Sequence, residues 1–190
     1  MKLNEKAFLT YKLFNSSFTG LSIGILFTIY QPLEDPSIHS IGGMILAIGM
    51  LLIAKFYEKI LNIKSFFIIS LAVEITILAT LAVFFLLQYS LVSALLIYCG
   101  YQLTFIFGGY LVRAETLVAK KKGLLSQIDV NKQIGYLIGL GTSYIFYKTL
   151  EFGFDISDGK TQINILHYLL TPLQIIIIFL LIKSFKKSNI

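Results

Sequence analysis

The sequence is poor in the residues on which soluble, disulfide-bonded and metal-binding domains depend. It has one cysteine, Cys99, three prolines and no tryptophan. A disulfide framework within the chain is therefore excluded, and no cysteine or histidine cluster has the spacing of a zinc site. Charged residues make up 14% of the chain, against about 25% in soluble domains. A chain so short of charge cannot coat a globule with polar surface, which excludes an ordinary water-soluble fold.

Apolar residues take the place of the missing charge. They form 56% of the 190 residues, and the mean hydropathy is +0.81. A lipid bilayer accepts such a surface, so the composition predicts an integral membrane protein. We expect a multi-pass protein of a bacterial inner (plasma) membrane, with the lipid bilayer as its first partner.

Six apolar runs are long enough to cross the hydrocarbon core, which takes about 20 residues. The predicted fold class is accordingly an all-α membrane protein, a single domain (residues 1–190) that forms a bundle of six transmembrane helices. The predicted spans are Leu13–Tyr30, Ile41–Ile60, Phe66–Leu87, Leu91–Ala119, Leu124–Tyr147 and Ile165–Ile182.

The basic residues predict the orientation of these spans. If the N-terminus is cytoplasmic, only Lys148 and Lys160 of the 16 lysines and arginines lie outside, beside several acidic residues. The positive-inside rule then predicts that both termini are cytoplasmic. The net charge of +6 is explained by this topology, so no nucleic-acid partner is expected.

A carboxyl group stands inside the third predicted span. Glu74 lies about ten residues into it, near the midplane at a rise of about 1.5 Å per residue. Acidic groups at that depth are costly and favour a functional hypothesis, so Glu74 is our candidate for proton coupling. The alternative is a neutral glutamic acid that is hydrogen-bonded to a neighbouring helix.

The turn between the fourth and fifth spans has charges at matched positions on either side. Arg113 lies eight residues before Lys121, and Asp129 lies eight residues after it. Equal spacing predicts equal depth on adjacent helices and hence an ion pair, with Glu115 and Lys132 as further partners. The pair could open and close as part of an inner gate, or it could be a static clamp at the membrane interface.

Uncharged polar residues gather on the first, fourth and fifth spans. If these faces converge, they line a substrate-binding cavity. The residues assigned to it are Asn15, Thr19, Gln102, Gln133 and Tyr136. The alternative is that these groups bond to backbone and neighbouring side chains, as polar residues in membrane helices commonly do.

Small residues predict two close helix contacts and one break. Gly20 with Gly24, and Gly135 with Gly139, have the spacing that lets two helices approach closely. Pro172 is expected to kink the sixth helix because it removes a backbone donor.

Enzyme motifs are absent from the sequence. It contains no GxSxG, no Walker loop and no HExxH. We therefore expect no catalysis, no cofactor and no metal.

The layout resembles one half of a major facilitator superfamily transporter. That family has a Gly-x-x-x-Asp-Arg-x-Gly-Arg-Lys pattern between its second and third helices; in the stretch 54–64 here, Glu58 and Lys59 keep the charges while both glycines are replaced. The family also places an arginine where Arg113 stands. The resemblance implies a substrate path between two six-helix bundles and a gating role for Glu58.

Three functions remain open at this point. The first is a half-size carrier of an unknown small solute that works as a homodimer. The second is a substrate-binding membrane subunit that works with a separate energising partner. The third is a membrane scaffold or assembly factor that transports nothing.

Overall fold

The computed structural model describes residues 1–25, 29 and 35–186. Helices make up nearly all of these residues, which confirms the predicted all-α class. The elements are β1 (Lys2–Leu3), α1 (Glu5–Ser22), α3 (Pro36–Lys55), α4 (Tyr57–Ile60), α5 (Ile63–Leu87), α6 (Leu91–Ala119), α7 (Lys122–Phe154), α8 (Gly159–Lys183) and β2 (Phe185–Lys186).

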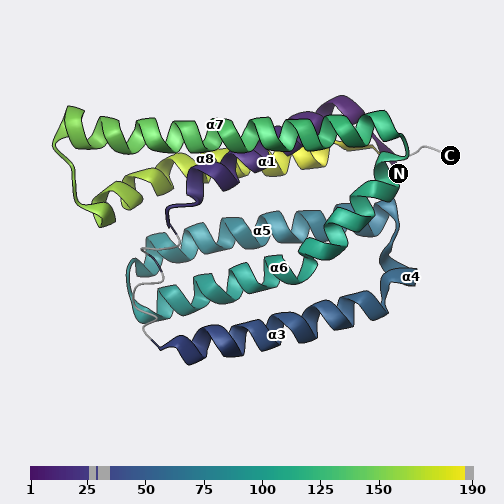
Figure 1. The fold of residues 1–190 in the computed structure, drawn as a ribbon, viewed down its shortest axis with the longest axis horizontal. Helices are drawn as coiled ribbons and strands as arrows, with labels where there is room; N and C mark the ends of the chain where they lie inside the picture. The colour runs from purple at the N-terminus through teal and green to yellow at the C-terminus, as the bar shows by residue number, and fades with distance from the viewer. Residues whose placement is uncertain (26–28, 30–34, 187–190) are drawn as a thin grey trace.

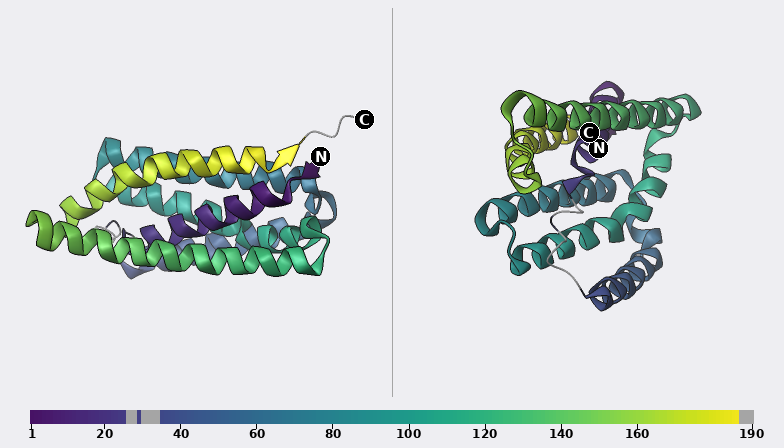
Figure 2. Two further views of the ribbon diagram at one scale, coloured as in Figure 1. Left: turned by 90° about the horizontal axis from the view of Figure 1, so that it is seen from above. Right: turned by 60° about the vertical axis from the view of Figure 1, so that its left-hand side comes forward.

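The long helices run side by side as a bundle (Figures 1 and 2). α1 lies between α7 and α8, α8 packs on α5, α5 packs on α6, and α6 packs on α3. Buried apolar side chains of α1, α5, α6 and α8 fill the centre. The order of packing therefore differs from the order in the sequence, and α1 is enclosed by helices from the C-terminal half.

Local sequence signals explain where the helices begin and end. Five capping side chains accept hydrogen bonds from backbone N–H groups in the first turn of a helix, which would otherwise lack partners; they are Asn4, Asp35, Asn62, Ser90 and Asp158. Three helices end where the backbone takes a positive φ, which reverses the chain. These residues are Gln88, Lys120 and Asp155.

Several predicted span boundaries need correction. The second span was expected at 41–60, but α3 starts at Pro36, after the cap on Asp35, and ends at Lys55; residues 57–60 form the separate helix α4. The fifth was expected to end at Tyr147, but α7 continues to Phe154. The first was expected over 13–30, whereas α1 begins at Glu5; residues 26–28 and 30 of that prediction lie outside the described residues. α8 continues through Pro172.

Four of the described helices are long and apolar enough to cross a membrane: α3, α5, α6 and α8. This finding supports a membrane protein. α1 and α7 carry more charged and polar side chains, so the six-span topology and the cytoplasmic termini remain predictions. α3 is the most exposed of the four, with Gly42 as its buried residue.

A short strand pair joins the two ends of the described chain. β1 and β2 are antiparallel, with Lys2 opposite Lys186 and Leu3 opposite Phe185, and they lie at one end of the bundle (Figure 1). The Phe185 ring packs 6.0 Å from the rings of both Phe8 and Phe66, centroid to centroid. This aromatic cluster fixes the start of α1 against the end of α8.

Glycines bring α1 and α7 into backbone contact. A Cβ atom on Gly139 would overlap the carbonyl oxygen of Ser17, and one on Gly135 would overlap that of Leu13. On the α1 side, a Cβ on Gly20 would overlap the carbonyl oxygen of Tyr136. The predicted close contact at Gly135 and Gly139 is therefore confirmed.

Candidate functional site

Glu74 is the centre of a buried polar cluster formed by three helices. Its side chain is on α5, and the residue is 1% exposed. On α1, the Tyr11 hydroxyl and the Asn15 amide donate to Oε1, at 2.6 Å and 2.8 Å. On α8, Nε2 of Gln174 donates to Oε2 at 2.8 Å and to the backbone oxygen of Glu74 at 2.9 Å. Both carboxyl oxygens thus have partners, as a buried charge requires.

Helical spacing explains why these groups meet. On α5, Phe66, Ser70 and Glu74 are buried and recur every four residues. Gln174 lies on the buried face of α8, between Leu170 and Ile177. Tyr11 and Asn15 are four residues apart, so they share one face of α1. The cluster therefore lies inside otherwise apolar helix contacts.

The cluster can exist in two hydrogen-bonded forms. The ionised carboxylate accepts from all three donors, whereas a proton on Oε2 would face the Nε2 donor of Gln174. The Oε1 atom of Gln174 is buried without a hydrogen-bond partner among the described residues. Rotation of this amide by about 180° would present that oxygen to a protonated Glu74, at the cost of the hydrogen bond from Nε2 to the Glu74 backbone oxygen.

A second cluster joins α1, α6 and α7 through charges. Glu115 on α6 is paired with Lys12 of α1 and with Lys132 of α7. Glu115 is 3% exposed, and the Lys12 side chain is 12% exposed and lies over the rings of Phe8 and Tyr11. Glu115 and Lys132 were expected as further partners of the Arg113–Asp129 pair. They pair with each other, and the additional pair with Lys12 makes this a contact of three helices.

The predicted pairing of Arg113 with Asp129 was wrong. Asp129 lies 3.6 Å from Lys132, and the Arg113 guanidinium lies 5.5 Å from the ring centre of Tyr57, next to α4. The prediction treated α6 and α7 as neighbours along their length, but they diverge from the turn at Lys120 (Figure 1). Arg113 is also outside the buried face of α6, whose members here are Ala114, Glu115 and Val118.

The five residues assigned to a substrate cavity do not share one in the described chain. Asn15 bonds to Glu74, and Thr19 and Gln133 are exposed. Gln102 and Tyr136 are half-buried on different helices, and Oε1 of Gln102 is buried without a hydrogen-bond partner among the described residues. None of the five residues lines the cavity between α1, α7 and α8, the cavity beside β1, or the cavity among α1, α5, α6 and α8.

Glu58, assigned to gating by the family resemblance, lies exposed on α4. It takes part in none of the ion pairs found among the described residues. The structure therefore brings Glu115, Lys132 and Asp129 together and leaves Glu58 apart from them.

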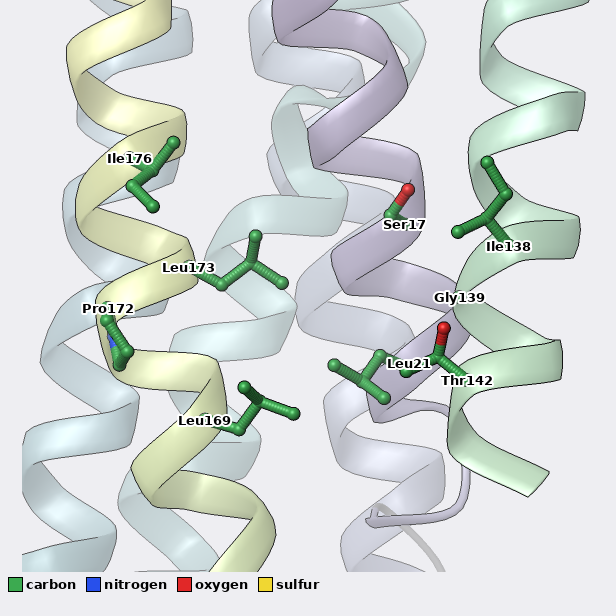
Figure 3. Close-up of a pocket in the computed structure, with 9 residues that line it drawn as sticks. All are labelled: Ser17, Leu21, Ile138, Gly139, Thr142, Leu169, Pro172, Leu173 and Ile176. Carbon is green, nitrogen blue, oxygen red and sulfur yellow. The ribbon is translucent and has the colours of Figure 1, made fainter. Parts of the chain in front are cut away.

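An apolar cavity of about 290 Å³ lies between α1, α7 and α8. In Figure 3, Ser17 and Leu21 reach it from α1, Thr142 from α7, and Leu169 and Pro172 from α8. Its hydroxyl groups are those of Ser17 and Thr142, and the Ser17 hydroxyl already donates to the Leu13 carbonyl. This cavity suits a hydrocarbon chain rather than a polar solute.

A smaller cavity of about 10 Å³ lies among α1, α5, α6 and α8. Ser22, Thr80, Tyr101 and His167 contribute polar groups to it. A space of this size holds about one water molecule. The His167 ring stacks on Phe84 with 3.7 Å between centroids, so this histidine is part of the packed interior.

Tyr11, Lys12 and Gln174 are functional candidates that sequence reasoning missed. Tyr11 and Lys12 precede the predicted first span, and Lys12 was counted only as a sign of topology. Gln174 is an amide directly before the apolar run 175–182 of α8, and an amide at that place was a usable signal. Among the described residues, no group of three or more metal-binding side chains is found.

Comparison of the chain with protein-family models, with curated proteins and with solved structures finds no match.

Proposed function

We propose that this protein is a membrane carrier of a small solute, built as two inverted repeats of three helices and completed by a second copy. The observation that carries the proposal is the symmetry of the helix packing. α1 packs on α7 as α6 packs on α3, and α1 packs on α8 as α6 packs on α5. α5 packs on α8, which are the third helices of the two repeats.

Exchange of the first three long helices with the last three maps these packing contacts onto one another. The contact of α6 with α7 beside their shared turn is the exception, because α1 and α3 have no contact of similar extent among the described residues. A repeat of three spans crosses the membrane an odd number of times, so the second repeat has the opposite orientation. Inverted repeats of this kind are typical of secondary transporters, including each half of a major facilitator superfamily protein. The pairing of α1 with α6 as equivalent helices therefore supports a carrier above a scaffold.

The exposed polar side chains support a solute path between two copies rather than within one. Thr19 and Gln133 are exposed on α1 and α7, and Tyr144 on α7 is 67% exposed. Polar groups on helices of this length favour contact with water or protein over lipid. A second copy facing these helices would enclose them in a shared cavity.

Glu74 is the proposed proton carrier. Its three donors come from two helices that belong to different repeats, so a proton on Glu74 changes the contact of α1 and α8 with α5. A proton can drive movement of one repeat against the other only if the contacts between the repeats differ between the protonated and ionised states. The bonds to Tyr11, Asn15 and Gln174 are the ones that would differ between the two states.

The proposal is tested by uptake into proteoliposomes with an imposed pH gradient, using pools of labelled amino acids, sugars, nucleosides and carboxylates. We expect uptake of at least one pool above that of protein-free vesicles. Gln133→Leu should abolish this uptake, whereas Gln127→Leu, at an exposed glutamine on the same helix, should not. Glu74→Gln should leave exchange of solute intact and remove its dependence on the pH gradient.

Three results would overturn the proposal or replace it. Binding of a solute without uptake would favour the substrate-binding subunit of a larger system. A monomer in detergent that neither binds nor moves any pool would favour the scaffold. Equal effects of Gln133→Leu and Gln127→Leu would remove the proposed solute path.

A further inference from the structure

A cavity of about 320 Å³ lies at the end of the bundle that holds the two strands. Its walls come from β1, from the start of α1 and α5, and from the turn that joins α6 to α7. Its lining includes Lys2, Glu5, Val118, Lys120, Lys121 and Leu124. We refer to these six residues as the basic pocket.

The interior of the basic pocket is apolar and its edge is charged. Val118 and Leu124 are 7% and 5% exposed, whereas Lys2, Lys120 and Lys121 are exposed. Such an arrangement separates a binding surface for hydrocarbon from one for a charged group. It fits an amphiphile better than a soluble metabolite.

The charges at the edge favour an anion. Three lysines face one acid, because Glu5 is 3.1 Å from the Lys121 ammonium. Among the described residues, Lys2 and Lys120 take part in no ion pair. The 33-residue helix α7 also begins here without a side-chain cap, so the positive end of its dipole adds to the same field.

The basic pocket lies at a fixed place along two of the helices that can cross a membrane. α6 ends at Ala119 and α5 begins at Ile63, and both residues line this cavity. The end of an apolar span is the depth at which lipid phosphate groups lie. Basic pockets between membrane helices at this depth bind anionic headgroups.

We propose that the basic pocket binds the phosphodiester group of an anionic phospholipid, with the lysines on the phosphate and the glycerol end of an acyl chain on Val118 and Leu124. The proposal needs the protein to be in a membrane, and it does not depend on transport. Failure of the carrier proposal would leave it intact.

Native mass spectrometry of the full chain in detergent tests it, with phosphatidylglycerol as the probe and phosphatidylcholine as the neutral reference. We expect one phosphatidylglycerol to be retained in preference. The triple variant Lys2→Gln, Lys120→Gln, Lys121→Gln should lose about 100-fold in affinity, because each lysine near an anionic lipid is worth about a factor of five. Replacement of the same three lysines by arginine should keep the binding.

The matched control removes three exposed lysines outside the pocket, Lys55, Lys59 and Lys64, and should change the affinity little. Equal losses in the two triple variants would mean general surface attraction and would overturn the proposal. Competition by inorganic phosphate as strong as that by the lipid would overturn it in favour of a free anion site. Should the glutamine triple not fold, Lys2→Gln and Lys120→Gln singly give the test, at about fivefold each.

Discussion

The contact between α1 and α7 predicts a large effect from adding one methyl group. In Gly139→Ala, the new Cβ would overlap the Ser17 carbonyl oxygen and lie 2.8 Å from the backbone nitrogen of Leu21. Both atoms belong to the α1 backbone, so no side-chain rotation relieves the overlap. α1 must move away from α7 by roughly 1 Å, and a gap of that size forfeits about a quarter to a half of each dispersion contact.

We expect Gly139→Ala to lower the free energy of unfolding by about 2–3 kcal/mol, the upper part of the range of about 1–3 kcal/mol for overpacking, because the overlap is with backbone atoms. For a chain of this length that is a loss of about 4–12 °C in Tm. Circular dichroism of the detergent-solubilised protein during heating measures it, with unfolding in sodium dodecyl sulfate as an independent scale.

The matched control is Gly141→Ala, two residues along the same helix. A Cβ at Gly141 meets no heavy atom within 4 Å, so this change should be neutral or stabilising by up to about 1 kcal/mol from helix propensity. If the two alanine variants unfold alike, α1 and α7 are not in backbone contact at Gly139.

Three further changes test separate parts of the structure. Glu115→Gln removes the acid that pairs with buried Lys12 and should lower the free energy of unfolding by about 3–5 kcal/mol. Asp129→Asn, at a side chain that is 65% exposed, should lower it by less than about 1 kcal/mol. Unfolding in sodium dodecyl sulfate measures both, and equal losses would contradict a buried ion pair at Glu115. The pKa of Asp158 is lowered by hydrogen bonds from Thr161 in the first turn of α8. The stabilisation of α8 by this carboxylate is therefore complete above the unfolded pKa of about 3.9 and is lost as the pH falls through the pKa in the folded protein. Hydrogen exchange at the start of α8 should rise over that pH range in the wild type and not in Asp158→Asn. Gln88 has φ 47° and ψ −131°, a conformation that favours glycine, so Gln88→Gly should raise stability by about 1 kcal/mol, and a lower Tm would count against that backbone.

The long helices could be predicted because apolar length and capping residues are local signals. The run from Leu91 to Ala119 and the cap at Ser90 stand together in the sequence, and α6 has those bounds. Glu74 could be singled out for the same reason, because a carboxyl group within an apolar run can be recognised from the sequence without knowing which helices pack against it.

The partners of Glu74 could not be predicted, because they depend on which helices pack together. Gln174 is 100 residues away along the chain, and no periodicity shows that α8 packs on α5 in addition to α6. The predicted pairing of Arg113 with Asp129 was wrong because Arg113 does not lie on the buried face of α6. Tyr110, Ala114 and Val118 recur every four residues and mark the buried face of α6, and Arg113 is outside that series.

The antiparallel pairing of Lys2–Leu3 with Phe185–Lys186 has a consequence for engineering. β1 and β2 are adjacent, so a short linker from β2 of one copy to β1 of the next needs no additional membrane crossing. A tandem gene would then hold two copies in one polypeptide with the same orientation. Each half could be varied separately, and the effect of a substitution in one copy could be measured against an unchanged second copy.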